Sequence, residues 1–442
     1  MFLEFFAKFS LILLIFLLPL EARWIFDQAD LKGAPFEYGT GALYFTDTLL
    51  FISAILTILW KWRSNANEEL RIRNQGFLWI YILIAGFGLM ALAGVGQAED
   101  RKIAVYAIMR LWEGLVLWWV VKNSPLKPQW AIAAFCFSAV LQAVWGMEQF
   151  FFQIVPANIW LGEAFHSALI LGDSVLQTAD GRFLRAYGTL PHPNILGGLL
   201  TAAILLLCGF IASNTEKRFK IQDLRFKIIA WGSLVLLIFG LFFTFSRSGW
   251  LAAGIGILFG VLWTAFAGRL KSVMGIIFTV IICVAVLILI FPEAFLRFSV
   301  QNRLEEMSVS ERVREYDDAQ IIVRENSFVG IGLNQYVKEL QNIYPSFPAW
   351  KIHPIHNIYL LIISELGIIG LLVFVIIIAW HLSFLNKHSL PLLIWSGAAA
   401  IGLLMIGLFD HYLWSLHFGL LLFWLIFGIF YRLAVGSSQK GP

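Results

Sequence analysis

The chain has 442 residues, of which 60% are hydrophobic and only 14% are charged. A soluble globular domain carries roughly 25% charged residues, so the composition excludes an ordinary soluble protein. The net charge of +4 comes from basic clusters between apolar segments, so it does not indicate nucleic-acid binding. Because these segments are too long and uninterrupted for a barrel, we expect an all-α fold, a polytopic integral membrane helix bundle.

Twelve apolar segments predict the membrane spans. Each approaches the roughly 20 residues that a helix needs to cross the hydrocarbon core. In chain order, the predicted spans are residues 5–22, 43–60, 77–95, 103–121, 130–152, 194–213, 228–245, 249–267, 273–291, 355–380, 391–409 and 413–431. We therefore expect a single transmembrane domain over residues 1–442 with about 12 helices.

The basic residues between the spans predict the orientation of the chain. Lys61 and Arg63 follow the second span, Lys217 and Arg218 follow the sixth, and the short connections after odd-numbered spans are poorer in basic residues. The positive-inside rule therefore places both termini and residues 214–227 in the cytoplasm.

The first span resembles a signal peptide in its short apolar core. The stretch Leu20-Glu21-Ala22 is a poor cleavage site, because signal peptides are cleaved after a pair of small residues. We interpret this span as an uncleaved anchor, with a cleaved signal peptide as the alternative.

Residues 292–353, between the ninth and tenth spans, form the longest predicted loop, which we expect to be extracytoplasmic. We predict a helix from Ser310 to Arg324, because Ser310 can cap its first turn. Gly330 and Gly332 are expected to end this helix, and three later prolines are expected to keep the remainder irregular.

On this topology, polar residues of unusual type converge on the extracytoplasmic face. They are Arg185, His192, Asn194, Arg247, Arg312, Arg314, His353, His356, Asn357, Asp410 and His411. Arg247 lies between two apolar runs, where an unpaired Arg costs several kcal/mol. Its planar guanidinium suits phosphate oxygens. The alternative is that Arg247 is a turn residue whose side chain snorkels to the membrane–water interface without binding a ligand. For Arg312 and Arg314, the alternative is a solvated helix face.

His356 lies at the start of the tenth span. A neutral imidazole can accept a proton from a hydroxyl near neutral pH, and a purely structural His is the alternative. At 100° per residue, Gly367 returns to within about 20° of the His356 face, whereas Glu365 falls on the opposite face.

No metal site is predicted. Cys136, Cys208 and Cys283 lie inside apolar spans, so we expect them to be small core residues.

Four stretches in residues 180–425 resemble the O-antigen ligase and O-antigen polymerase-like membrane glycosyltransferases. They are Arg185-Ala-Tyr-Gly-Thr-Leu-Pro-His-Pro-Asn194, Ser246-Arg-Ser-Gly-Trp250, Ser310-Glu-Arg312 with Asn326-Ser-Phe-Val-Gly-Ile-Gly332, and His356-Asn357 followed after nine residues by Gly367. The last of these matches the ligase signature of that family.

The resemblance implies an inverting glycosyltransferase of ligase type, without metal or cofactor, in the cytoplasmic membrane. Its partners would be a glycan on undecaprenyl diphosphate and a lipid, glycan or protein acceptor, with the active site on the extracytoplasmic side. Within the family, a polymerase is the alternative activity, and a transporter of lipid-linked glycan is the alternative from another class.

The resemblance also implies roles for the residues of the outer face. Arg247 and Arg312 would hold the diphosphate, with Arg185 and Arg314 as secondary candidates, and His356 would activate the acceptor hydroxyl. The supporting residues would be Asn357, His192, Asn194 and His353.

Overall fold

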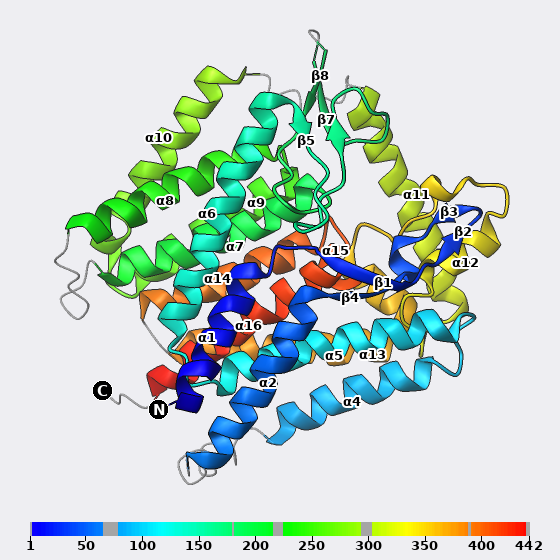
Figure 1. Cartoon of the computed structure of the whole chain (residues 1–442), viewed down its shortest axis with the longest axis horizontal. Helices are drawn as coiled ribbons and strands as arrows, with labels where there is room; N and C mark the ends of the chain where they lie inside the picture. The colour runs from blue at the N-terminus through cyan, green and yellow to red at the C-terminus, as the bar shows by residue number, and fades with distance from the viewer. Residues whose placement is uncertain are drawn as a thin grey trace.

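The computed structural model describes residues 2–64, 78–178, 181–214, 224–292, 303–387 and 390–438. Its helices are α1 (Phe2–Leu17), α2 (Phe45–Arg63), α4 (Leu78–Gly94), α5 (Arg101–Asn123), α6 (Pro128–Phe152), α7 (Pro193–Asn214), α8 (Leu224–Phe243), α9 (Arg247–Phe266), α10 (Met274–Ile290), α11 (Arg303–Glu325), α12 (Tyr336–Ile343), α13 (Ile358–Leu382), α14 (Pro391–Ile406), α15 (Tyr412–Ser415) and α16 (His417–Ser438). The all-helical fold class is thereby confirmed (Figure 1).

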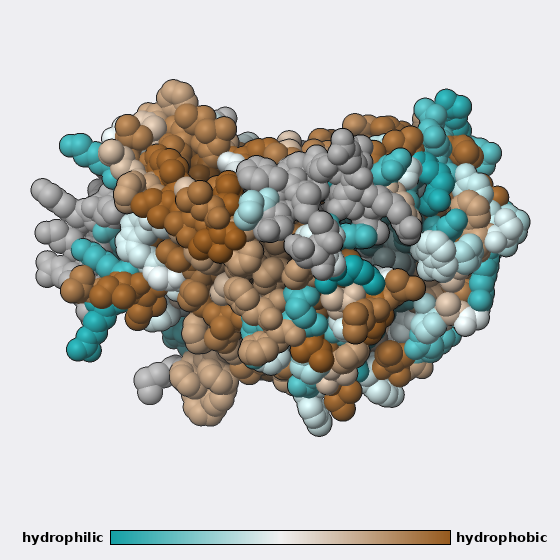
Figure 2. Space-filling view, turned by 90° about the horizontal axis from the view of Figure 1, so that it is seen from above, coloured by the Kyte–Doolittle hydropathy of each residue, from teal (hydrophilic) through white to brown (hydrophobic). Residues whose placement is uncertain are grey.

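Eight of the described helices are long and apolar enough to cross a membrane, and three shorter apolar helices accompany them. Every one of the twelve predicted spans overlaps a described helix. That all twelve cross the membrane stays a prediction. Figure 2 shows a broad hydrophobic area over the left half of one face, with hydrophilic residues most frequent toward its right side. An exposed apolar area of this kind is expected for a protein surrounded by lipid.

Helix α7 forms the centre of the bundle. It packs against α14, α9, α8 and α6, and 94% of its apolar stretch is buried inside the protein. A helix that is hydrophobic all round and enclosed in this way is a core element. Its first residues therefore provide a fixed support for whatever lies at that end of the bundle.

The two ends of the bundle differ in structure. The two termini lie together at one end, whereas the strands, α11 and α12 gather at the other (Figure 1). The strands are β1 (Arg23–Asp27), β2 (Asp30–Leu31), β3 (Ala34–Pro35), β4 (Gly41–Tyr44), β5 (Ile154–Val155), β6 (His166–Ser167), β7 (Val175–Thr178) and β8 (Gly181–Leu184). They form four antiparallel pairs, β1 with β4, β2 with β3, β5 with β6 and β7 with β8.

A second, smaller hydrophobic core holds the segment between α1 and α2 against the predicted long loop. Leu31 and Phe36 pack there with Ile322 of α11 and with Tyr336 and Leu340 of α12. In the same region, the Lys32 ammonium donates to the carbonyl oxygens of residues 344, 345 and 347. Residues 31–36 are therefore held against α11, α12 and the turn that follows α12.

The predicted loop helix is longer than expected. Helix α11 is already formed at Arg303, and residues 293–302 before it lie outside the described residues. Ser310 is therefore inside the helix and does not cap it, since its hydroxyl donates to the carbonyl of Met307 at 2.9 Å. The prediction of an irregular remainder was also wrong, because α12 forms there. Of the predicted cytoplasmic connector 214–227, residues 215–223 lie outside the described residues.

Helix α13 is broken at Gly367, which has φ 66° and ψ −176°. The turn after α11 supplies the missing backbone hydrogen bonds, from Ile331 N to Ser364 O (3.0 Å) and from Ile368 N to Ser327 O (2.9 Å). Asn357 caps α13, so His356 precedes the helix. The predicted helical face shared by His356 and Gly367 was therefore wrong, because no continuous helix joins them.

Candidate functional site

A cavity of about 430 Å³, here called the arginine cavity, lies at the end of the bundle that carries α11. Its lining residues come from five separate parts of the chain. They are Arg185, His192, Asn194, Arg247, Ser248, Leu251, Ser308, Glu311, Arg312, Glu315, His356 and Phe409. A second cavity of about 740 Å³, here called the wide cavity, shares His192, Asn194, Glu311 and His356 with the first. The two cavities therefore meet at His356.

Arg247 and Ser248 reach the arginine cavity from the first turn of α9. This helix begins where the hydroxyl of Ser246 accepts from the amide of Gly249 at 3.2 Å. The N-terminus of a helix carries a partial positive charge and favours anions. The Arg247 guanidinium and the start of α9 therefore both favour negative charge here.

Arg312 reaches the same cavity from α11. Ser308, Glu311, Arg312 and Glu315 all line it, and their spacing of three, four and seven residues places them on one helix face. Arg314 points elsewhere, since its guanidinium lies 5.5 Å from the centre of the Phe347 ring. The structure thus brings Arg247 and Arg312 together but does not bring Arg314 to either cavity.

Arg185 is the most enclosed of the three cavity arginines, with an exposure of 5%. Its Nε donates to the carbonyl of Thr244, and its Nη2 donates to Oδ1 of Asn194, both at 2.7 Å. The Asn194 amide in turn donates to Asp410 at 2.9 Å. Arg185 and Asn194 therefore join the start of α7 to the turn before α9 and to the loop before α15.

His356 is held by Glu315. The Glu315 carboxylate accepts from the His356 backbone amide at 3.0 Å and lies 2.9 Å from the ring Nδ1. A carboxylate acceptor places the ring proton on Nδ1. This leaves the lone pair of Nε2 available, in a side chain that lines both cavities.

Glu315 and His356 shift each other's pKa. Burial lowers the pKa of His356, but the hydrogen bond and the charge of Glu315 outweigh it and raise this pKa above its ordinary value. Burial raises the pKa of Glu315, but the hydrogen bond and charge of His356 outweigh it and lower that pKa. The pair is therefore a fixed carboxylate and an imidazole of increased basicity.

The neighbouring histidines are less basic or already bonded. His192 precedes α7, where its Nδ1 accepts from the backbone N–H of Asn194 at 3.1 Å and its Nε2 lies 2.7 Å from the Ser174 hydroxyl. Burial lowers the pKa of His192 and of His411. Burial also lowers the pKa of His353, whose Nδ1 lies 3.5 Å from Glu315. His356 therefore differs from them in basicity.

Asn357, a predicted support residue, forms most of its hydrogen bonds with backbone groups. Its Oδ1 accepts from the amides of Tyr359 and Leu360, at 2.9 and 3.1 Å. Its amide also lies 3.3 Å from the carbonyl of Leu408. Asn357 thus fixes the start of α13 and the position of His356 next to it.

Two groups of side chains here have the types that bind metal ions. They are Glu315, His353 and His356, and His356, Asp410 and His411. Both groups contain His356, so an ion at either one would take up its imidazole lone pair. That the site works without metal stays a prediction.

Glu315 and Asp410 are the residues whose roles the sequence reading missed. Glu315 lies three residues after Arg312, so helical spacing was the signal that could have found it. Asp410 was predicted on the same side as the other polar residues, but its contact with Asn194 depends on the tertiary fold.

Residues 232–375 match the family described as O-antigen ligase. This stretch contains Arg247, Arg312, Glu315 and His356, and it covers about a third of the 442 residues. No curated protein matches the chain. The match confirms that this part of the chain resembles the O-antigen ligase family, as the sequence motifs indicated.

Proposed function

We propose that the chain is a ligase-type glycosyltransferase that transfers a glycan from undecaprenyl diphosphate to an acceptor hydroxyl on the outer side of the cytoplasmic membrane. The single observation that carries this proposal is the position of His356. It lies between a cavity lined by three arginines and a wider cavity large enough for a sugar. A transferase needs this arrangement, because donor phosphate and acceptor hydroxyl must meet at one base.

The arginine cavity suits a diphosphate leaving group. As the bond between the anomeric carbon and the diphosphate oxygen breaks, the leaving group takes the electron pair and gains negative charge. Fixed positive groups stabilise such charge where it develops. Arg247, Arg312 and the start of α9 supply them, and Arg185 holds the adjoining backbone.

The proton moves in the opposite direction. The acceptor hydroxyl gives its proton to Nε2 of His356 as its oxygen attacks the anomeric carbon from the face opposite the diphosphate, which inverts the configuration. Glu315 stabilises the imidazolium that forms, through the contact at Nδ1. His192, Asn194 and Asn357 keep the surrounding backbone in place.

A polymerase would use the same residues with a second lipid-linked glycan as acceptor. The family description favours a ligase. A transporter is favoured only by the break in α13, since broken helices form substrate sites in such proteins. Here the turn after α11 fills the break with its own backbone, so the break does not provide a path.

The test uses purified full-length protein in lipid nanodiscs, with undecaprenyl-diphosphate-linked glycan and a panel of acceptors. We expect a new glycosidic product and release of undecaprenyl diphosphate, both measured by mass spectrometry, without added metal and in the presence of a chelator. Absence of product with every acceptor, including a second lipid-linked glycan, would contradict both the ligase and the polymerase.

Substitution of Arg247 tests the diphosphate site. Arg247→Lys keeps the charge but loses the bidentate fork, so we expect donor binding and transfer to fall by about tenfold or more, in line with a charged hydrogen bond. Arg324→Lys on the exposed end of α11 is the matched control and should behave as the wild type. Unchanged donor binding in Arg247→Ala, at normal protein level, would remove this assignment.

A further inference from the structure

The wide cavity differs from the arginine cavity in the sign of its charge. Five carboxylate residues line it, whereas the only arginine among its lining residues is Arg23. The carboxylates are Glu21, Glu37, Glu163, Glu311 and Asp410. Arg23 is itself paired with Glu37. This pair neutralises Glu37, and burial raises the pKa of Glu21 and of Glu163. Glu311 and Asp410 therefore carry the negative charge that disfavours a phosphate or carboxylate group in this cavity.

Glu163 has an unused hydrogen-bonding atom at this cavity. The residue is 8% exposed, and its Oε1 accepts from Nε1 of Trp145 at 2.7 Å and from Nε2 of Gln149 at 3.2 Å. Its Oε2 is buried without a hydrogen-bond partner in the described part of the chain. A buried acceptor without a partner costs free energy, and a ligand that donates a hydrogen bond would recover it.

Aromatic rings form another part of the wall. Tyr38 and Tyr44, from the segment between α1 and α2, line the wide cavity together with His411 and His417. Aromatic side chains have an apolar body and a polar tip. Such rings beside carboxylate acceptors fit the two surfaces of a sugar, its C–H faces and its hydroxyl edges.

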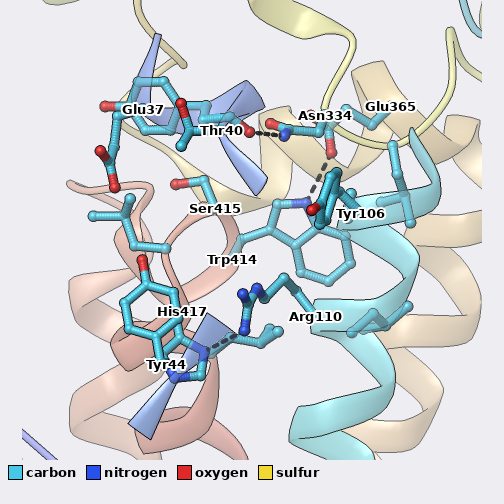
Figure 3. A pocket seen from close by; sticks show the side chains of 16 residues that line it. Glu37, Thr40, Tyr44, Tyr106, Arg110, Asn334, Glu365, Trp414, Ser415 and His417 are labelled. Carbon is cyan, nitrogen blue, oxygen red and sulfur yellow. Dashed lines mark hydrogen bonds between the residues drawn. The ribbon is translucent and has the colours of Figure 1, made fainter. Parts of the chain in front are cut away.

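The Tyr44 ring is held in place by residues of a smaller cavity next to the wide cavity. The two cavities share Glu37, Tyr38 and Tyr44 among their lining residues (Figure 3). The Arg110 guanidinium lies 4.8 Å from the centre of the Tyr44 ring, and the His417 ring stacks on Tyr44 at 4.0 Å. Arg110 also donates to Asp47 at 2.9 Å and to Glu113 at 2.7 Å. Its positive charge is thereby balanced, so Arg110 positions Tyr44 and adds no anion site.

From these observations we infer that the wide cavity binds the sugar of a phosphate-free, hydroxyl-rich acceptor, neutral or bearing an amine, with its reactive hydroxyl at His356. This inference rests on the proposed transfer function for the direction of the reaction. The parts of the wall formed by residues 21–44 and 155–195 lie outside residues 232–375, which match the family. A large part of the acceptor wall thus comes from the N-terminal half of this chain.

Direct binding tests the cavity without requiring transfer. The probes are the disaccharide of N-acetylglucosamine, the disaccharide of glucosamine, and the 1-phosphate of the latter, titrated onto full-length protein in nanodiscs and followed by ligand-observed NMR. We expect both unphosphorylated probes to bind and the phosphorylated probe to bind at least tenfold more weakly. Phosphate binding that is equal or tighter would overturn the inference, as would the absence of binding by all three.

A substitution locates the site. Glu163→Gln should weaken binding of the glucosamine disaccharide by about tenfold, the size of a lost hydrogen bond to a charged group, and leave binding of undecaprenyl diphosphate unchanged. Glu148→Gln, on the exposed surface of α6, is the matched control. An unchanged affinity in Glu163→Gln would overturn the role of Glu163, and if that variant does not fold, the order of the three probes on the wild type decides alone.

The two proposals fail in different ways. If the sugars bind in the expected order but no lipid-linked donor reacts, the transfer function is wrong and the sugar site stands. If transfer occurs and phosphorylated acceptors are used as well as the others, the transfer function stands and the sugar preference is wrong.

Discussion

The imidazole of His356 has its Nδ1 held by Glu315, and its Nε2 forms no hydrogen bond within the described part of the chain. If Nε2 is the general base, His356→Gln keeps polarity but removes basicity. Loss of a general base costs about 10²–10⁴-fold in rate, so we expect kcat to fall by that order while donor binding survives. Single-turnover transfer and a donor-binding measurement check this.

His353 is the internal control for that substitution. It lies 3.5 Å from the same carboxylate but lines only the wide cavity. His353→Gln should therefore reduce the rate much less than His356→Gln. A rate within about twofold of wild type for His356→Gln would exclude this residue as the base, and loss of donor binding would instead indicate a structural role.

Glu315 controls the pH at which His356 is an effective base. Transfer requires the neutral imidazole, so the rate falls as the pH drops through the pKa of His356, which lies above the ordinary value of 6.5. Glu315→Gln removes the main cause that raises this pKa and leaves burial, which lowers it. We expect the acid limb of kcat/KM to move to lower pH and the maximum rate to fall. An unchanged pH profile would contradict the pairing.

Sequence alone predicted only part of this site. The residue types and their predicted side of the membrane placed Arg247, Arg312 and His356 in one group, and all three line the arginine cavity. The sequence could not decide which of Arg312 and Arg314 faces the site. Residues two positions apart on a helix point about 200° away from each other, and only the packing of α11 determines which of them faces the cavity. Glu315 was missed because an acidic residue on a polar helix is usually solvated, and only the fold brings it to His356.

At the scale of elements, Gly367 is the position where α13 depends most on a glycine. An added Cβ would lie 2.1 Å from the carbonyl oxygen of Phe328, and the φ of 66° is unfavourable for other residues. We expect Gly367→Ala to destabilise the protein by at least ~1–3 kcal/mol, measured as a lower melting temperature in detergent.

Gly254 in α9 is the matched control. It has open space around an added Cβ and no positive φ, so Gly254→Ala should leave the melting temperature equal or higher, because Ala favours helix. Equal melting temperatures for both variants would show that the break in α13 is not held by the turn at residues 326–332.

Hydropathy predicted the long helices well, since a run of apolar residues has few other solutions in a membrane. The strands were missed for a different reason. The described strands have two to five residues each, too short for an alternating pattern, and tertiary packing holds them. The break in α13 was missed because glycine is common in transmembrane helices.

At the scale of the whole molecule, the topology predicts which end faces outward. Ser346 is exposed and lies shortly after α12. Ser213 lies at the C-terminal end of α7, far along that helix from the residues at the arginine cavity. Single cysteine substitutions at these positions, treated in intact cells with an impermeant thiol reagent, should label at Ser346 and not at Ser213.

The native cysteines provide a low background for that experiment, because Cys136, Cys208 and Cys283 are all buried. If only the Ser213 variant were labelled, the protein would have the opposite orientation to the one predicted. This result would also place the arginine cavity on the cytoplasmic side, where a lipid-linked donor made for export could not be used as proposed.

The enclosure of α7 also has a consequence for how the protein is made. Helix α7 ends at Asn214, but α14, against which it packs, begins only at Pro391. At a synthesis rate of roughly 5–20 residues per second, that interval is on the order of 10–40 s. During this time one side of α7 must face lipid or a chaperone, which explains why a helix destined for a protein interior is apolar on every side. A ribosome that stalls before α14 would leave the centre of the bundle open to the membrane.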